Sequence, residues 1–262
     1  MTNPAAEFQL ESPRAGQALA VDLVAPQAGR PTVLYLHGLG SSQDGDKARF
    51  FRSRVAAEGL GFCSFDLPGH GRSGGAMREL TLSGAIAAAE SVHRWLSERA
   101  APPSLVLGSS FGALIGLWMA ARAPQRVAAL VGLAPSIGLR DGIDGGLGDE
   151  GLGRWRDGGV LRFEDSLGSL ELGWEFYGDL EAWDGRDLAD GYRIPSLLLQ
   201  GMRDDRVSWR AVADFAGRCG ARVELHLFAD GDHRLTDRKE TLWRMALDFW
   251  THGGHLPAGR DS

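Results

Sequence analysis

Two stretches of this 262-residue chain place a serine between glycines at the spacing Gly-x-Ser-x-Gly: GSSFG at residues 108–112 and GRSGG at residues 71–75. A serine held at this spacing on a sharp strand-to-helix turn can act as a nucleophile. SLVL before Ser110 predicts a strand and ALIGLWMAA after it predicts a helix, whereas Ser73 follows the loop sequence DLPGHGR. The flanking sequence therefore predicts that Ser110 is a nucleophile and that Ser73 is a polar loop residue.

A serine hydroxyl is a weak nucleophile at neutral pH and needs a general base held in place by a third group. His233 lies in ADGDHRL, a loop sequence after a predicted strand and downstream of Ser110. The remaining histidines lie in a helix, a strand, the polar tail or upstream loops, namely His93, His226, His252, His255, His37 and His70. We therefore expect His233 to be the base.

The third group is expected to be an aspartate that follows a neighbouring strand. Asp204 and Asp205 come after the predicted strand at residues 196–201, and Asp204 has the spacing Gly-x-x-Asp with a valine three residues on. Asp230 and Asp232 lie too close to the histidine in sequence to reach across to its ring. Asp204 is therefore the predicted acid, and Asp205 a loop or turn residue.

Apolar runs of strand length alternate with segments of helical period along the chain. The predicted strands cover residues 32–38, 61–69, 104–110, 126–135, 196–201 and 222–228, and the predicted helices cover residues 44–59, 81–100, 113–123, 209–220 and 235–250. Nearly continuous apolar strands that alternate with helices indicate a parallel sheet covered on both faces. The more alternating residues 7–25 predict an antiparallel pair at the edge of the sheet.

Residues 137–193 differ from this pattern. They contain 14 glycines and seven aromatic residues, and we expect little regular structure there. A connection of this length inside a compact domain is usually a functional lid or a disordered insertion, and the aromatic side chains favour a folded lid. The sequence therefore predicts a core at residues 1–136 and 194–262 and a cap at residues 137–193. We expect some cap aromatics to wall a pocket over the serine and others to pack the cap, among them Trp155, Phe163, Trp174, Tyr177 and Trp183.

Composition excludes several classes of function. A net charge of −6 and a pI near 5.7 argue against a nucleic-acid surface. The two cysteines, Cys63 and Cys219, are too few for a cysteine-based zinc site or a disulfide framework, and we expect buried free thiols. No apolar run is long enough for a membrane span, and the first residues do not have the pattern of a signal peptide. A cytoplasmic protein is therefore predicted.

Five blocks taken together resemble the α/β-hydrolase superfamily: LYLHGLG, FDLPGHGRSGG, VLGSSFGALIG, LLLQGMRDDRVSW and DGDHRL. SSQDGDKA and DGDHRL further resemble its bacterial and mitochondrial serine-esterase branch, which includes depalmitoylating thioesterases. The resemblance implies an α/β fold with a mostly parallel eight-stranded sheet, helices on both faces and a cap inserted before the strand that carries the acid. It also implies an oxyanion hole formed by the backbone N–H groups of Phe111 and Leu39, although HGLG departs from the HGGG form. His37 is expected to brace that loop.

The predicted function is hydrolysis of a small-molecule carboxylic ester or thioester through an acyl-Ser110 intermediate, with no metal or other cofactor. A carbon–carbon hydrolase, an amidase or a perhydrolase could use the same three side chains, since a fold does not decide a function. A ligand-binding receptor with little turnover is an alternative from another class. The acyl group, the alcohol and the oligomeric state do not follow from the sequence.

Overall fold

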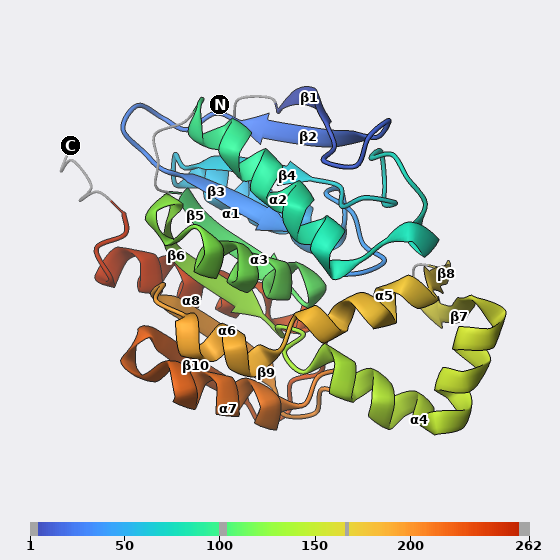
Figure 1. Ribbon diagram of the computed structural model, residues 1–262. Coiled ribbons are helices and arrows are strands. Elements are labelled where there is room, and N and C mark those ends of the chain that lie inside the picture. Colours follow the sequence, from blue (N-terminus) through green and yellow to red (C-terminus); the bar gives the residue numbers. More distant parts are fainter. Residues whose placement is uncertain (1–4, 100–103, 166–167, 257–262) are drawn as a thin grey trace.

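A computed structural model describes residues 5–99, 104–165 and 168–256 (Figure 1). Its main sheet has eight strands in the order β1-β2-β4-β3-β5-β6-β9-β10. These are β1 (Ala6–Glu11), β2 (Ala18–Val24), β3 (Thr32–Leu36), β4 (Gly61–Phe65), β5 (Ser104–Ser109), β6 (Val127–Leu133), β9 (Ser196–Gly201) and β10 (Val223–Phe228). All neighbours from β4 to β10 pair in parallel, while β2 is antiparallel to both β1 and β4. The predicted, mostly parallel eight-stranded sheet is confirmed.

The burial of each strand explains its sequence pattern. Every residue of the central strands β3, β4, β5 and β9 is buried, as expected for strands covered on both faces. The edge strand β1 alternates between exposed and half-buried residues, and Phe8 pairs with Val21 of β2 in the antiparallel register. The alternating pattern at the start of the chain therefore comes from this edge pair, as predicted.

Helices cover both faces of the sheet (Figure 1). One buried cluster joins the sheet to α2, α3 and α7, and a second joins the opposite face to α1 and α8. The bounds are α1 (Asp46–Ala57), α2 (Leu82–Ser97), α3 (Phe111–Arg122), α7 (Trp209–Cys219) and α8 (Lys239–His252), with short 3₁₀ turns at Met77–Glu79, Pro124–Arg126, Gly220–Arg222 and Thr236–Arg238. The helices predicted from periodicity are therefore all present.

The inserted segment, residues 137–193, is more regular than its composition predicts, and that expectation was wrong. It contains α4 (Leu139–Gly158), the antiparallel pair β7 (Val160–Asp165) and β8 (Gly168–Gly173), α5 (Trp174–Asp179), a 3₁₀ turn at Leu180–Ala182 and α6 (Gly185–Gly191). Tertiary packing overrides the low helix propensity of the glycines in α4. Trp155 is 2% exposed and its Nε1–H donates to the Leu172 carbonyl oxygen at 3.0 Å. Gly148, with φ 60°, kinks the helix.

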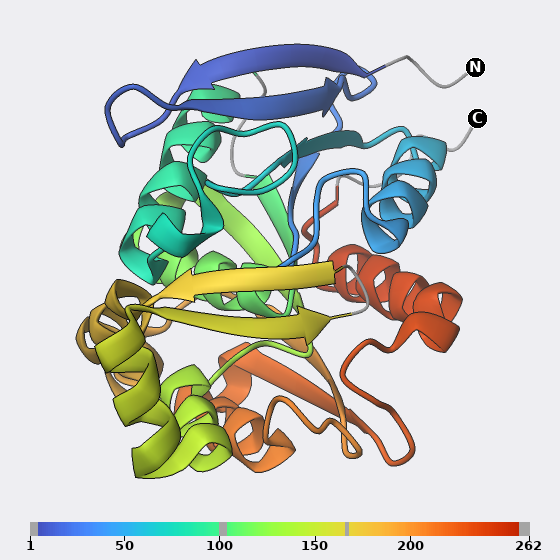
Figure 2. The ribbon, with the colours of Figure 1, turned by 90° about the vertical axis from the view of Figure 1, so that its right-hand side faces the viewer.

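The carboxyl ends of the parallel strands lie together at one end of the sheet, and the loops that follow them gather there. Figure 2 looks toward these carboxyl ends, with the yellow β7–β8 pair lying in front of them. The loops after β3, β5, β9 and β10 carry the residues that the sequence singled out for chemistry. Ligands bind at the carboxyl ends of the strands in open α/β sheets.

Candidate active site

Ser110 lies at the junction of β5 and α3 with φ 54° and ψ −118°. Such a backbone conformation is strained by about 1–3 kcal/mol in a residue other than glycine, and it occurs preferentially at active sites. The glycines on either side of the serine are required because backbone atoms of neighbouring elements approach them too closely for a Cβ. A Cβ on Gly112 would overlap the carbonyl oxygens of Leu36 and His37, and a Cβ on Gly108 would lie 2.5 Å from the α3 backbone. The packing of α3 onto β3 and β5 therefore forces the serine into this tight turn.

His233 and Asp204 complete a hydrogen-bonded chain with Ser110. The Oγ of Ser110 lies 3.0 Å from Nε2 of His233, and Nδ1 of His233 lies 2.8 Å from Oδ2 of Asp204. The His233 side chain is 14% exposed and that of Asp204 is 0% exposed. When Nδ1–H donates to the carboxylate, Nε2 carries the free lone pair and accepts from the serine hydroxyl. The structure thus brings together the three residues that the sequence singled out from three different loops.

Both oxygens of the Asp204 carboxylate accept hydrogen bonds. Oδ1 accepts from the backbone N–H groups of Arg206 at 2.9 Å and Val207 at 2.8 Å, and Oδ2 also accepts from Nε2 of Gln200 at 2.8 Å. Burial raises the pKa of Asp204, but the hydrogen bond and charge of His233, together with the Val207 and Gln200 hydrogen bonds, outweigh burial and lower it. The carboxyl group is therefore ionised and held in one orientation.

The neighbouring aspartates have other partners. Asp205 is exposed. Asp232 accepts from the backbone N–H of Leu235 at 2.7 Å, and Asp230 pairs with Arg238 at 2.7 Å. None of these three carboxylates belongs to the hydrogen-bonded chain that contains the histidine.

The backbone N–H groups of Leu39 and Phe111 are available for a ligand. Both residues line the cavity that contains Ser110, and neither N–H has a hydrogen-bond acceptor among the described residues. Phe111 is the first residue of α3, where the helix dipole adds partial positive charge. Gly38 lies so close to the serine that a Cβ on it would be 3.3 Å from the Ser110 Cβ. These two N–H groups can therefore donate to an oxyanion that forms beside the serine.

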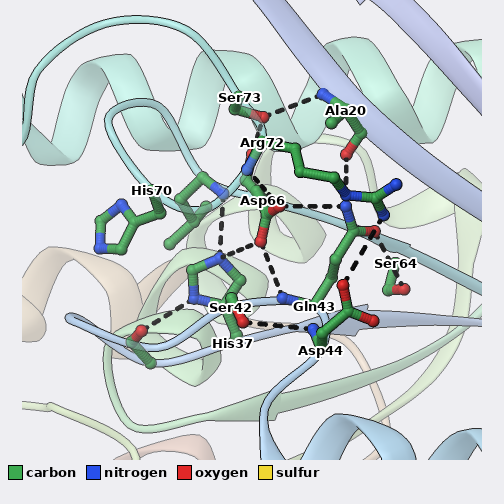
Figure 3. Close-up of polar contacts among 12 residues, drawn as sticks. Ala20, His37, Ser42, Gln43, Asp44, Ser64, Asp66, His70, Arg72 and Ser73 are labelled. Atoms are coloured by element: carbon green, nitrogen blue, oxygen red, sulfur yellow. Dashed lines mark hydrogen bonds and ion pairs between the residues drawn. The ribbon is translucent and has the colours of Figure 1, made fainter. Parts of the chain in front are cut away.

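A buried polar network holds the β3–α1 loop, residues 37–45, in place (Figure 3). At its centre is Asp66, which is 1% exposed. Its Oδ1 accepts from the Gln43 N–H at 2.8 Å, and its Oδ2 accepts from Gln43 Nε2 at 3.1 Å and from the Arg72 N–H at 2.8 Å. The loop after β4 and the β3–α1 loop are therefore tied to one carboxylate, which limits the movement of Leu39.

Two neutral histidines strengthen this network. Nδ1–H of His37 donates to the Gly38 carbonyl oxygen at 2.8 Å, and its Nε2 accepts from the Leu67 N–H at 3.0 Å. Nε2 of His70 accepts from the Gly40 N–H at 3.1 Å. Burial is the main reason that both histidine pKa values are lowered, that of His37 to about 3. Both rings therefore accept hydrogen bonds, and His37 lies where the sequence analysis expected a brace for this loop.

Ser73, the second serine with the glycine spacing, belongs to the same network (Figure 3). Its Oγ donates to the Asp66 carbonyl oxygen at 2.6 Å and accepts from the Ala20 N–H at 2.9 Å. The side chain therefore links the loop after β4 to β2, and its hydroxyl is occupied by structural hydrogen bonds.

Ser136 is a site residue that the sequence analysis missed. It follows β6, is buried, and its Oγ lies 3.1 Å from the Oγ of Ser110. Its backbone N–H also donates to the Ser110 carbonyl oxygen at 3.3 Å. No motif marks this serine, and the one available signal is its position after the strand that pairs with β5.

A cavity of about 330 Å³ lies above Ser110. The inserted segment contributes Leu139, Phe163 and Leu170 to its wall. Of the five cap aromatics considered in the sequence, Phe163 alone lines this cavity. Trp155, Trp174 and Tyr177 pack against one another, and Trp183 packs edge-on against Trp118 of α3.

Within the described ranges, no group of three or more His, Cys, Asp or Glu side chains is arranged to hold a metal. No helix in the same ranges is long and apolar enough to cross a bilayer.

Cys63 is buried, Cys219 is half-buried, and both thiols are free. Burial is the main cause that raises the pKa of Cys219 to about 11, so its thiol is not a ready nucleophile.

Known proteins resemble this chain over most of its length. The mitochondrial palmitoyl-protein thioesterase ABHD10 of Bos taurus is 25% identical over 234 residues, which cover 80% of this chain and 69% of the relative. The crystal structure of a putative hydrolase from Agrobacterium vitis S4 is 26% identical with a TM-score of 0.84 and covers 94% of this chain and 99% of that chain. The structure of alpha/beta hydrolase domain-containing protein 10 from mouse is 23% identical with a TM-score of 0.76, covering 95% and 99%.

The bovine relative is named as mitochondrial, so the predicted cytoplasmic location stays a prediction. The family model described as "alpha/beta hydrolase fold" matches residues 31–180, which run from β3 through the nucleophile turn into the inserted segment. Because this match covers more than half of the sequence, the chain belongs to the α/β-hydrolase family.

Proposed function

We propose that this protein hydrolyses carboxylic esters or thioesters through an acyl-serine intermediate on Ser110. One observation carries the proposal: the serine Oγ, both ring nitrogens of His233 and the Asp204 carboxylate form one chain of hydrogen bonds at 3.0 Å and 2.8 Å. The chain opens onto a cavity that could hold the acyl group. The names of the bovine relative and its mouse counterpart support a thioester among the substrates.

In the first half of the reaction, the Oγ of Ser110 attacks the carbonyl carbon while His233 accepts its proton. The carbonyl oxygen becomes an oxyanion between the N–H groups of Leu39 and Phe111, where one such donor contributes about 3–4 kcal/mol. Protonated His233 then gives its proton to the departing alkoxide or thiolate. Asp204 holds the imidazole in the required tautomer and stabilises the imidazolium.

In the second half, His233 accepts a proton from water, and the hydroxide adds to the acyl carbon. A second oxyanion forms at the same two N–H groups. It collapses by expelling the Ser110 alkoxide, which recovers its proton from the imidazolium. The products are a carboxylic acid and the free serine, so the cycle needs neither metal nor redox chemistry.

The inserted segment supplies the substrate wall in this proposal. We take residues 1–136 and 194–262 as the core and residues 137–193 as the cap, as the sequence analysis expected. Phe163 and Leu170 of the β7–β8 pair face the cavity from the cap, and Leu39 and Phe111 face it from the core. Apolar side chains on two sides suit an acyl chain. The last cap helix, α6, lies against α3 and α7, away from the β7–β8 pair (Figure 1).

The test compares 4-nitrophenyl butyrate with a butyryl thioester, using the wild type and Ser110→Ala. Turnover of both substrates that disappears in Ser110→Ala, together with a fluorophosphonate adduct mapped to the same serine, is the expected result. Ser73→Ala is the matched control, because that serine has the same glycine spacing and only structural hydrogen bonds. Turnover that survives in Ser110→Ala, or a label on another residue, would contradict the proposal. One equivalent of nitrophenol per chain without further release would favour the receptor alternative.

A further inference from the structure

Lys47 stands out among the residues of the Ser110 cavity. It is one of only two lysines in the sequence and lies in the first turn of α1. Its side chain is half-buried and lines the same cavity as the serine. Nζ donates a hydrogen bond to the Oγ of Ser109, the residue before the nucleophile, at 3.1 Å.

The ammonium group has no carboxylate partner within the described part of the chain. Its one hydrogen bond goes to a neutral hydroxyl, although an ammonium has three N–H donors. Lys239, the other lysine, pairs with Asp46 at 2.7 Å. A cation withdrawn from water is destabilised unless an anion or several hydrogen bonds compensate for its lost hydration. Lys47 therefore keeps unused donors in the wall of the cavity.

The charges that surround this lysine leave it protonated at neutral pH. Burial is the main cause that lowers the pKa of Lys47 to about 8. Asp232 and Asp204, from the loops after β10 and β9, and Asp46 on α1 raise that pKa through space, while Arg234 lowers it. An ammonium with a pKa near 8 is still charged at pH 7, so the cavity contains a positive charge.

The other charged residues of the cavity wall leave the Lys47 ammonium without a competing carboxylate partner among the lining residues. Arg206 and Arg234 also line the cavity. Asp46 is the one carboxylate among the lining residues, and Lys239 already neutralises it. The remaining wall includes the apolar side chains of Leu39, Phe163 and Leu170. The cavity therefore contains both apolar side chains and the Lys47 ammonium.

We propose that Lys47 binds a carboxylate that the substrate carries away from its scissile bond, so that the enzyme selects acyl esters or thioesters with a second, anionic end. This inference rests on the proposed hydrolysis at Ser110. A substrate carboxylate would accept hydrogen bonds from the two N–H groups of the Lys47 ammonium that are not bonded to Ser109. Charge-assisted hydrogen bonds of this kind are about twice as strong as neutral ones.

The experiment measures the preference for an anionic substrate. The 4-nitrophenyl hemiesters of glutarate and adipate are compared with 4-nitrophenyl pentanoate and hexanoate, which have a methyl group in place of the carboxylate. We expect the wild type to prefer the hemiesters at least tenfold in kcat/KM, mainly through KM. Lys47→Met should bring this ratio close to one, and Lys47→Arg should preserve it. Arg49→Met, on the exposed face of the same helix, is the matched control and should keep the wild-type ratio.

The pH dependence of the ratio is a second readout. The preference of the wild type should fall as the pH rises through about 8, because Lys47 loses its charge there. Effects of pH on the shared chemistry at Ser110 act on both substrates and are therefore largely removed by taking the ratio. In Lys47→Met the ratio should not change over the same pH range. A wild-type ratio that is near one, or that Lys47→Met leaves unchanged, would overturn the inference.

Calorimetric binding of glutaramate and pentanamide separates this inference from the proposed function, because it needs no turnover and because only glutaramate carries a carboxylate. Tighter binding of glutaramate that depends on Lys47 but not on Arg49 would support the anion site even if no ester were hydrolysed. Hydrolysis of all four esters with glutaramate and pentanamide bound equally would sustain the proposed function and refute the anion site. Thermal unfolding and fluorophosphonate labelling of each variant show that it is folded with a reactive serine.

Discussion

Replacing Asp204 by asparagine tests whether the carboxylate controls the position of the His233 proton. The backbone N–H groups of Arg206 and Val207 both point at Oδ1, so the oxygen of an asparagine side chain must stay there. Its NH₂ group then takes the place of Oδ2, where it faces Nδ1 of the histidine and loses the hydrogen bond from Nε2 of Gln200. The imidazole must accept at Nδ1, which moves its own proton to Nε2 and directs that proton at Ser110.

The serine then has no base, although its surroundings are almost unchanged in shape. We expect kcat to fall by about 10⁴-fold, the usual cost of the wrong tautomer. This corresponds to about 5.4 kcal/mol at 1.36 kcal/mol per factor of ten. Asp205→Asn changes the exposed neighbouring carboxylate and should alter kcat by less than about threefold, since an isolated surface substitution has little effect.

The assay is initial-rate hydrolysis of 4-nitrophenyl butyrate at pH 7.5 by both variants and the wild type. Thermal unfolding confirms that each variant is folded. Equal losses of kcat in Asp204→Asn and Asp205→Asn, or a loss of kcat below tenfold in Asp204→Asn, would refute the tautomer argument. Another carboxylate would then have to hold His233.

Three further predictions concern the general base, the loop that carries an oxyanion donor, and the cavity wall. His233→Ala should cost nearly as much turnover as Ser110→Ala, with the double variant little worse, because such residues act as a unit; additive losses in steady-state rates would contradict this. Asp66→Asn places an amide N–H against a backbone or side-chain donor, so urea unfolding should show a loss of about 1–3 kcal/mol, and an unchanged midpoint would show that the network is dispensable. Phe163→Ala enlarges the cavity wall and should shift the preferred acyl chain length across a 4-nitrophenyl ester series. Arg162→Ala on the same strand, which pairs with Glu171 on the exposed side of the β7–β8 pair, should keep the wild-type profile; identical profiles for the two variants would mean that β7 does not line the acyl site.

The order of strands and helices was predictable because burial on both faces leaves continuous apolar runs in β3, β5 and β9. The choice of Ser110 over Ser73 was also local, since a strand, a glycine-flanked turn and a helix are all encoded within about twenty residues. The regular structure of the inserted segment was not predictable in this way. Its glycines argue against helix α4, and the helix exists because Trp155 and its neighbours pack against other elements.

The sequence by itself determined which residues end the strands of a parallel sheet, because strand and helix periodicity is a property of adjacent residues. It did not determine which of those residues touch. The pairing of β9 with β10 in a parallel register brings Asp204 to His233, and the pairing of β5 with β6 brings Ser136 to Ser110. Lys47 reaches the cavity because α1 packs on the face of the sheet that lets its first turn approach β5. Only the tertiary structure decided these contacts, since they depend on strand order, register and helix packing between residues far apart in the chain.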